Sequence, residues 1–138
     1  MAQESLIIRQ AQWTDAHARL LAAAMRADPL VTVETLRAAV ANGAASLIEV
    51  IDSADQMVCA AVLRVECREL GNEGVIVAAA GALPGGRLLP VVLPVLENSF
   101  RGVNSIRVHT ARPGLVRALA RHGYAPREVI LSKMIGVH

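Results

Sequence analysis

The sequence predicts a single mixed α/β (α+β) domain, because strand-like and helix-like patterns alternate along its 138 residues. The clearest succession is strand, helix, strand over residues 105–135. A second observation is a hairpin signal over residues 45–67, where two apolar runs flank a polar turn at 53–56. A chain of this length fits one domain around one core, so we expect the domain to span residues 1–138.

The strand, helix, strand succession depends on local periodicity and on two punctuating residues. Ile106 and Val108 alternate with polar neighbours, as a half-buried strand requires. Pro113 stands where the first turn of a helix needs no N–H group, and Gly123 is expected to end that helix. The apolar run over residues 128–135 then predicts a final strand.

The other elements are expected in a simple order along the chain. They are a strand over 6–9, helices over 14–26 and 32–41, hairpin strands over 45–52 and 57–67, a central strand over 74–80 and a helix over 88–100. Pro94 falls inside the last of these helices and removes a hydrogen bond, which costs ~3 kcal/mol if it is not accommodated. We therefore expect a kink or a late start in that helix.

The C-terminal succession, with the pair Gly123 and Tyr124 after its helix, resembles the GCN5-related N-acetyltransferases, the GNAT family. The resemblance extends over nearly the whole chain. It implies a mixed central sheet of six to seven strands flanked by about four helices, in the order β-α-α-β-β-β-α-β-α-β. It also implies that two neighbouring parallel strands, ending near Ala80 and Thr110, splay apart and leave a wedge-shaped cleft for an acyl-CoA.

The turn after the central strand is where this family binds the CoA pyrophosphate, through backbone N–H groups at a helix N-terminus. The family pattern is basic-x-x-Gly-x-Gly/Ala, and this chain matches it only imperfectly. The resemblance implies that Leu83, Gly85, Gly86 and Arg87 bind the cofactor, with Arg112 as a further contact for CoA phosphates. The alternative is that Pro-Gly-Gly is an ordinary turn without a ligand.

The family's general acid is often a Tyr four residues before the terminal Gly, and an Asn near the start of the same helix assists it. Leu119 occupies the Tyr position here, and Arg112 lies near the Asn position. A leucine cannot donate a proton, so the CoA thiolate would take its proton from water or from Tyr124, His109 or His122. Tyr124 is our candidate among these groups.

A general base is the other catalytic group that the resemblance implies. In the family it is often a carboxylate with a tuned pKa on the central strand or on the strand before it. The central strand over 74–80 contains no acid, which leaves Glu66, Glu69 and Glu73 nearby. We take Glu66 and Glu73 as the candidate bases, with solvated charges at strand ends as the alternative interpretation.

Composition indicates more apolar surface than a lone domain normally carries. Hydrophobic residues make up 54% of the chain, the mean hydropathy is +0.42, and 19% of residues are charged, against an average of about 25%. Apolar segments at 88–96 and 20–25 are the candidate contact surfaces. We therefore expect a homo-oligomer or a subunit of another protein assembly, although the many alanines could account for the count.

Several classes of function are disfavoured by the sequence. The longest uncharged run, 74–86, has 13 residues, whereas a membrane-spanning helix needs about 20. The four histidines and two cysteines show no metal-ligand spacing, so we expect no metal site. Residues 70–138 are basic, but the chain has only three aromatic residues to stack on bases, which makes nucleic acid an improbable partner.

Two functions follow from these observations. The first is a GNAT-fold protein that is catalytically weak or silent and serves as a structural, assembly or binding component. The imperfect phosphate turn and the Arg-Pro-Gly helix start are similar to divergent GNAT-like proteins of bacteriophages, so the chain would be cytoplasmic or carried into a phage particle. The second is an N-acetyltransferase that uses acetyl-CoA, or another acyl-CoA, to modify a primary amine.

Overall fold

The computed structural model describes residues 5–25, 31–81, 88–110 and 112–136. Its elements are, in order, β1 (Ile7–Gln10), α1 (Asp15–Ala22), α2 (Val33–Ala41), β2 (Ser46–Ile51), β3 (Met57–Arg68), β4 (Gly71–Gly81), α3 (Leu89–Ser99), β5 (Ser105–Val108) and α4 (Pro113–Ala120). This order agrees with the predicted succession up to the end of α4. No helix in the described ranges is long and apolar enough to cross a membrane.

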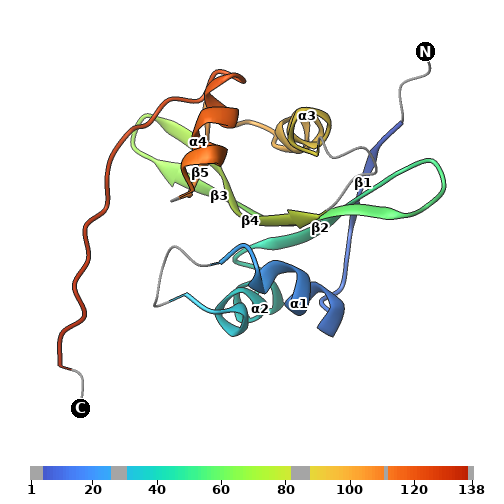
Figure 1. The fold of residues 1–138 in the computed structure, drawn as a ribbon, viewed down its shortest axis with the longest axis horizontal. Helices are drawn as coiled ribbons and strands as arrows, with labels where there is room; N and C mark the ends of the chain where they lie inside the picture. The colour runs from blue at the N-terminus through green and yellow to red at the C-terminus, as the bar shows by residue number, and fades with distance from the viewer. Residues whose placement is uncertain (1–4, 26–30, 82–87, 111, 137–138) are drawn as a thin grey trace.

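The strands form one sheet in the order β1-β2-β3-β4-β5. The pairs β1–β2, β2–β3 and β3–β4 are antiparallel, whereas β4 and β5 are parallel. Helices α1 and α2 cover one face of the sheet, and α3 and α4 lie on the other (Figure 1). The fold is therefore α+β, as the sequence predicts, with four helices and a mixed sheet among the described residues.

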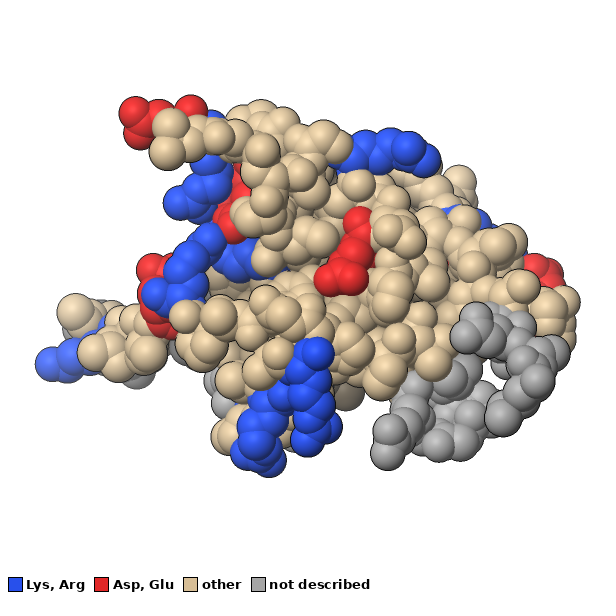
Figure 2. Space-filling view, turned by 90° about the horizontal axis from the view of Figure 1, so that it is seen from above, with Lys and Arg blue, Asp and Glu red and all other residues tan. Residues whose placement is uncertain are grey.

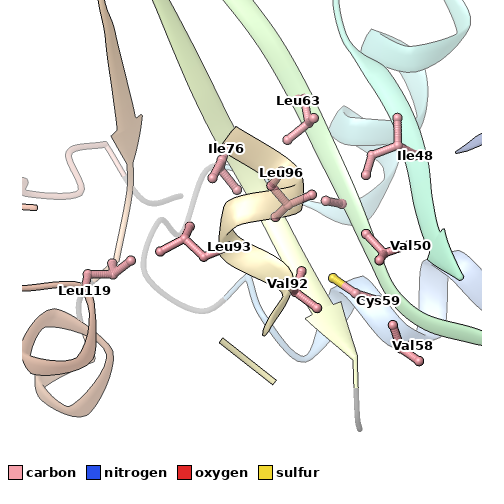
Figure 3. Close-up of a cluster of buried hydrophobic side chains, with 11 residues drawn as sticks. Ile48, Val50, Val58, Cys59, Leu63, Ile76, Val92, Leu93, Leu96 and Leu119 are labelled. Atoms are coloured by element: carbon pink, nitrogen blue, oxygen red, sulfur yellow. The ribbon is translucent and has the colours of Figure 1, made fainter. Parts of the chain in front are cut away.

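Two cores form because both faces of the sheet are covered by helices. On the α3 side, Val92, Leu93 and Leu96 of α3 pack toward Leu63 and Ile76 of the sheet (Figure 3). On the other side, Leu21 of α1 and Leu36 of α2 pack against Leu47 and Val62. The central strands β3 and β4 contribute to both cores, which fixes their position in the middle of the molecule.

Helix α3 buries part of the segment that the sequence suggested as a contact surface. Val92, Leu93 and Leu96 are at most 3% exposed and belong to the core, whereas Pro90, Val91 and Pro94 are exposed. The helix begins at Leu89, one residue later than expected, and continues through Pro94, whose side chain is exposed.

The predicted final strand over 128–135 is wrong, and the residues that the structure describes form a sheet of five strands instead of six or seven. Residues from Ala125 to Gly136 are exposed and belong to no helix or strand. The apolar pattern of this segment is strand-like, but a strand also needs a partner for its backbone groups. Within the described part of the chain β5 pairs with β4 alone, and residues 125–136 run away from the sheet (Figure 1).

Gly81, at the end of β4, is required by a close approach of two strands. A Cβ atom at this position would collide with the carbonyl oxygen of Val58 and would lie 2.7 Å from the Cα atom of Cys59. We expect Gly81→Ala to lower the free energy of unfolding by about 1–3 kcal/mol, as overpacking does. Urea denaturation measures this change.

Gly114→Ala in α4 is the matched control, because the nearest atom to its added Cβ is 4.0 Å away. It should leave the free energy of unfolding unchanged or raise it slightly, since Ala favours helix more than Gly does. Equal stability of the Gly81→Ala variant and the wild type would contradict the close approach.

Candidate functional site

The parallel strands β4 and β5 stay together for only part of their length. They are paired over four residues each, and the last pair is Ile76 with Val108. Strand β4 continues beyond this pair to Gly81, still bonded to β3 on its other side. The two neighbouring parallel strands that the sequence predicts are therefore present, and their pairing ends before β4 does.

A bulge in β4 lies where this pairing ends. Val62 of β3 faces Ala78, whereas the next residue, Leu63, faces Ile76, so Val77 is an extra residue in β4. A β-bulge bends its strand and increases the local twist. Because Val77 directly follows the last β4–β5 pair, the bend accounts for the separation of the two strands from this point onward.

A cleft of about 320 Å³ lies over the separated strand ends. We call it the β4–β5 cleft. The described residues that line it come from β3, β4 and the end of β5, from α3 and α4 with the residue before each, and from the two residues after α1. They are Ala23, Ala24, Cys59, Ile76, Ala79, Ala80, Gly81, Leu88, Leu89, Val92, Leu93, Leu96, Val108, Arg112, Leu115 and Leu119.

The lining of the β4–β5 cleft is almost entirely apolar. Arg112 is its one charged side chain among the described residues, and it stands at the N-terminal end of α4. Cys59 is the other titratable group, and burial raises the pKa of its thiol to about 11. Cys59 is therefore protonated at neutral pH and is a poor nucleophile. The described lining thus offers an apolar surface with Arg112 as its one cation.

The small side chains of Ala79 and Ala80 make room for this cleft at the end of β4. The sequence predicts a cleft between β4 and β5, where the structure has it, but it does not predict that these alanines or α3 line the cleft. The signal that could have identified them is the change in β4 from the large Val75, Ile76 and Val77 to three successive alanines.

The candidate base Glu73 lies away from the cleft, near the start of β4, and 2% of it is exposed. Its Oε1 accepts hydrogen bonds from Arg107 at 2.6 Å and from Arg68 at 3.4 Å. Its Oε2 accepts from Arg127 at 2.7 Å and from Ser105 at 3.0 Å. Three arginines and a hydroxyl thus surround one buried carboxylate.

These contacts lower the pKa of Glu73 to about 2. The hydrogen bond from Arg127 is the largest cause; burial opposes it, and the bond from Ser105 and the charges of Arg127 and Arg107 lower the pKa further. A carboxylate with so low a pKa is a weak proton acceptor. The arrangement fits a role in joining β4, β5 and the C-terminal segment.

Glu66, the other candidate base, belongs to the same group of charges. Its Oε1 accepts from Arg107 at 2.7 Å and from Arg64 at 2.8 Å. The bond from Arg107 is the main cause that lowers the pKa of Glu66; desolvation opposes it, and Arg64 lowers the pKa further. Figure 2 views the molecule from the side of α3 and α4. Most of the charged side chains in this view lie toward one side, and much of the remaining surface in view is uncharged.

Tyr124, the candidate acid, links the end of α4 to α3. Its hydroxyl donates a hydrogen bond of 2.8 Å to Glu97, and its ring packs against the core on the α3 side. Burial, together with that bond and the charge of Glu97, raises the pKa of Tyr124 well above its usual range. Tyr124 is not one of the described residues that line the β4–β5 cleft.

The structure brings Arg112 alone, of the predicted site residues it describes, into the cleft. Glu66 and Glu73 lie together outside it, and Tyr124 lies apart from both. Their catalytic roles stay predictions. The predicted phosphate-binding residues Leu83, Gly85, Gly86 and Arg87 lie outside the described residues.

A second polar group, on the α1 and α2 side of the sheet, was not identified from the sequence. The backbone N–H of Thr14 donates to Nδ1 of the buried His17, so Nε2 carries the proton of a neutral ring and donates to Glu49 at 2.7 Å. Arg9 also donates to Glu49, at 2.8 Å. Burial raises the pKa of Glu49, but the bonds from His17 and Arg9 lower it overall.

The group of Arg9, His17 and Glu49 ties β1 and α1 to β2, which is a structural task. The part of the chain that the structure describes brings together no three His, Cys, Asp or Glu side chains able to hold a metal ion. The β4–β5 cleft is therefore the candidate functional site.

Comparison with solved structures shows what this fold resembles. An acetyltransferase from Trypanosoma brucei is 14% identical, with a TM-score of 0.65, over 95% of this chain and 100% of that one. A protein from Clostridium difficile 630 described as a possible acetyltransferase is 12% identical, with a TM-score of 0.67, over 96% and 99%. A transcriptional regulator from Bacillus halodurans C-125 is 17% identical, with a TM-score of 0.66, over 95% and 100%.

These likenesses show that the chain has the GNAT acetyltransferase fold, as the sequence resemblance implied. No protein-family model and no curated protein matches the sequence.

The buried carboxylate of Glu73 makes stability depend on pH. Because folding lowers its pKa from 4.5 to about 2, its contribution is complete above about pH 4.5 and is lost as the pH falls toward 2. We expect Glu73→Gln to lower the free energy of unfolding at pH 7 by about 2–3 kcal/mol, because an amide cannot pair with the surrounding arginines. Urea denaturation at several pH values measures both effects.

The stability difference between wild type and Glu73→Gln should shrink as the pH falls from 4.5 toward 2. Glu69→Gln, at an exposed position near the β3–β4 turn, should behave like the wild type. A pH-independent difference would show that the ion pairs of Glu73 do not stabilise the fold.

Proposed function

We propose that this GNAT-fold protein binds an acyl-CoA in the β4–β5 cleft, catalyses acyl transfer weakly or not at all, and serves as a binding or structural component of a protein assembly. The observation that carries the proposal is the chemistry of the cleft lining. It combines an apolar surface with Arg112, and its described residues include no carboxylate, imidazole or phenol.

The shape and charge of the cleft support the binding part of the proposal. A volume of about 320 Å³ lies at the lower end of the range for small-molecule sites, which is roughly 300–1,000 Å³. Apolar walls from Ala79, Val92 and Leu115 suit an acyl group and the pantetheine arm. Arg112 at the rim suits a CoA phosphate, because a guanidinium forms strong, charge-assisted hydrogen bonds with phosphate oxygens.

The absence of a proton acceptor in the described lining supports weak catalysis. Attack by an alkylammonium substrate requires loss of a proton, and a positioned base typically contributes 10²–10⁴-fold to such a step. Glu66 and Glu73 are held by arginines outside the cleft, and both have a lowered pKa. Tyr124 donates to Glu97 with a raised pKa, so it is a poor acid toward a thiolate.

The alternative is an acetyl-CoA-dependent N-acetyltransferase that modifies a primary amine. It is favoured by the names of the Trypanosoma brucei and Clostridium difficile proteins that share the fold. A thioester is already activated, so holding it beside an amine supplies much of the rate through proximity and orientation. The bacteriophage particle as the setting for an assembly role is proposed on the sequence resemblance alone.

Calorimetric titration with acetyl-CoA tests binding. We expect micromolar affinity for the wild type and a loss of at least about tenfold for Ala79→Phe, because the larger side chain fills the cleft. Arg112→Ala, at an exposed position before the first residue of α4, should weaken binding about five- to tenfold. Ala120→Phe is the control, since Ala120 is exposed on α4 outside the cleft lining.

No heat at millimolar acetyl-CoA, or equal affinity in all four proteins, would refute binding in the cleft. Release of free CoA thiol in the presence of a panel of primary amines tests the catalytic part. We expect rates close to those without protein, whereas saturable turnover that Ala79→Phe abolishes would establish the acetyltransferase alternative.

A further inference from the structure

We propose that a second hollow, at the end of β4 opposite the β4–β5 cleft, binds the phosphate group of a small phosphorylated molecule. We call it the β3–β4 hollow, because it lies where β3 turns into β4. Its volume is about 380 Å³, and it is lined by residues 68–73 together with Asn104, Ser105 and Arg127. The proposal goes beyond acyl-CoA binding and does not depend on it.

The β3–β4 hollow and the β4–β5 cleft are separate places. On β4 the hollow ends at Glu73, whereas the cleft begins at Ile76, the last residue of β4 that pairs with β5. The two linings share no described residue. In Figure 1 the turn from β3 to β4 lies at the left edge of the sheet, and β4 leads away from it toward the centre.

Arginine charge is in excess beside the β3–β4 hollow. One connected group of ion pairs holds four guanidinium groups and two carboxylates, which are Arg64, Arg68, Arg107, Arg127, Glu66 and Glu73. Both carboxylates are ionised at neutral pH, because the arginines lower their pKa. Four positive charges against two negative ones leave a net charge of +2. Glu69 at the rim reduces it to +1, but Glu69 is exposed, so solvent and salt screen its charge.

Two of these arginines have hydrogen-bond donors to spare. The side chains of Arg68 and Arg127 are 53% and 51% exposed, whereas that of Arg107 is 16% exposed. Within the described part of the chain, Arg68 and Arg127 reach their carboxylate partners through Nη1 alone. A guanidinium has five N–H donors, so most donors of both side chains are available to a ligand.

Glu73 holds these two guanidinium groups in place before any ligand arrives. Its Oε2 accepts from Arg127 at 2.7 Å, and its Oε1 accepts from Arg68 at 3.4 Å. Because Glu73 itself is buried in β4, the two guanidinium groups are tied to the sheet. Donors that are held in advance lose less conformational entropy when a ligand binds. Guanidinium groups also form strong, charge-assisted hydrogen bonds with phosphate oxygens.

The opposite wall of the hollow is polar and well ordered by its own hydrogen bonds. The backbone N–H of Asn72 donates to Oδ1 of Asn104 at 3.0 Å, and the N–H of Asn104 donates to the carbonyl oxygen of Asn72 at 2.8 Å. Gly71 has a φ of +150°, and a Cβ atom there would collide with the side chain of Asn104. Because Oδ1 is the acceptor, the Nδ2 group of Asn104 is a donor for a ligand.

A phosphate ester fits this charge better than a carboxylate does. It carries about −1.5 to −2 at pH 7 and offers three strong acceptor oxygens. A carboxylate carries one negative charge and two oxygens. The volume of the hollow lies within the range of small-molecule sites, roughly 300–1,000 Å³, which leaves room for more than the phosphate group.

Titration with inorganic phosphate, followed in ¹⁵N-resolved NMR spectra at constant ionic strength, tests the proposal. The amide signals of residues 68–73, 104, 105 and 127 should shift and saturate with a Kd of ~1 mM, which is within reach of so small an ion. Acetate is the carboxylate probe. It should bind at least about tenfold more weakly, because it carries less charge and fewer acceptor oxygens.

Three variants test the residues of the hollow. Arg68→Gln and Arg127→Gln should each weaken phosphate binding at least about fivefold, because each removes a charged donor. Asn104→Asp keeps the acceptor for the N–H of Asn72 and leaves every ion pair of Glu73 intact. It places a negative charge in the lining and should weaken binding at least about tenfold.

Arg37→Gln is the matched control, because it removes the same charge at an exposed position on α2. Its affinity for phosphate should stay within about twofold of the wild type. Lack of saturation at the hollow by about 20 mM phosphate overturns the proposal. Shifts confined to residues 112–115, equal affinity for acetate, or unchanged affinity in Asn104→Asp overturn it too. Acetyl-CoA is expected to occupy the cleft at micromolar concentration, so failure of one titration does not count against the other site.

Discussion

The parallel pairing of β4 with β5, and its end at Ile76 and Val108, is the constraint on which the rest of the molecule depends. Without this pairing, α3 and α4 would not come to lie on the same face of the sheet, and Arg107 could not reach Glu73. If the pairing continued to Gly81, no space would remain between the strand ends. The extra residue Val77 bends β4 at this point. This one irregularity in register separates a half of the sheet in which β4 and β5 are paired from a half in which they are apart.

The two halves have opposite chemical character, and this division explains the function that we propose. The paired half carries Glu66 and Glu73 with their arginines, where ionic groups neutralise one another and hold β5 and the C-terminal segment in place. The open half is apolar apart from Arg112. Carboxylates that could serve as bases are thus engaged in structure, whereas the ligand-sized space has apolar walls and favours binding over proton transfer.

The sequence predicts those parts of the molecule that depend on neighbours in the chain. The helices, the hairpin and the parallel order of β4 and β5 follow from periodicity, turn residues and family resemblance. The final strand could not be predicted correctly, because the pattern of Val129 to Leu131 reports strand tendency and not the presence of a partner. Likewise Glu73 and Arg127 are 54 residues apart, so no local pattern reveals their ion pair. The cleft residue Arg112 was predicted, but the lining alanines of β4 were not.

The location of a bound acyl-CoA tests this account most directly. In ¹⁵N-resolved NMR spectra, titration with acetyl-CoA should shift the amide signals of residues 78–81 and of residues 112–115, which border the β4–β5 cleft, with little change at residues 66–73. Shifts concentrated in the charged half of the sheet, or no shifts at saturating ligand, would contradict a ligand site created by the separation of β4 from β5.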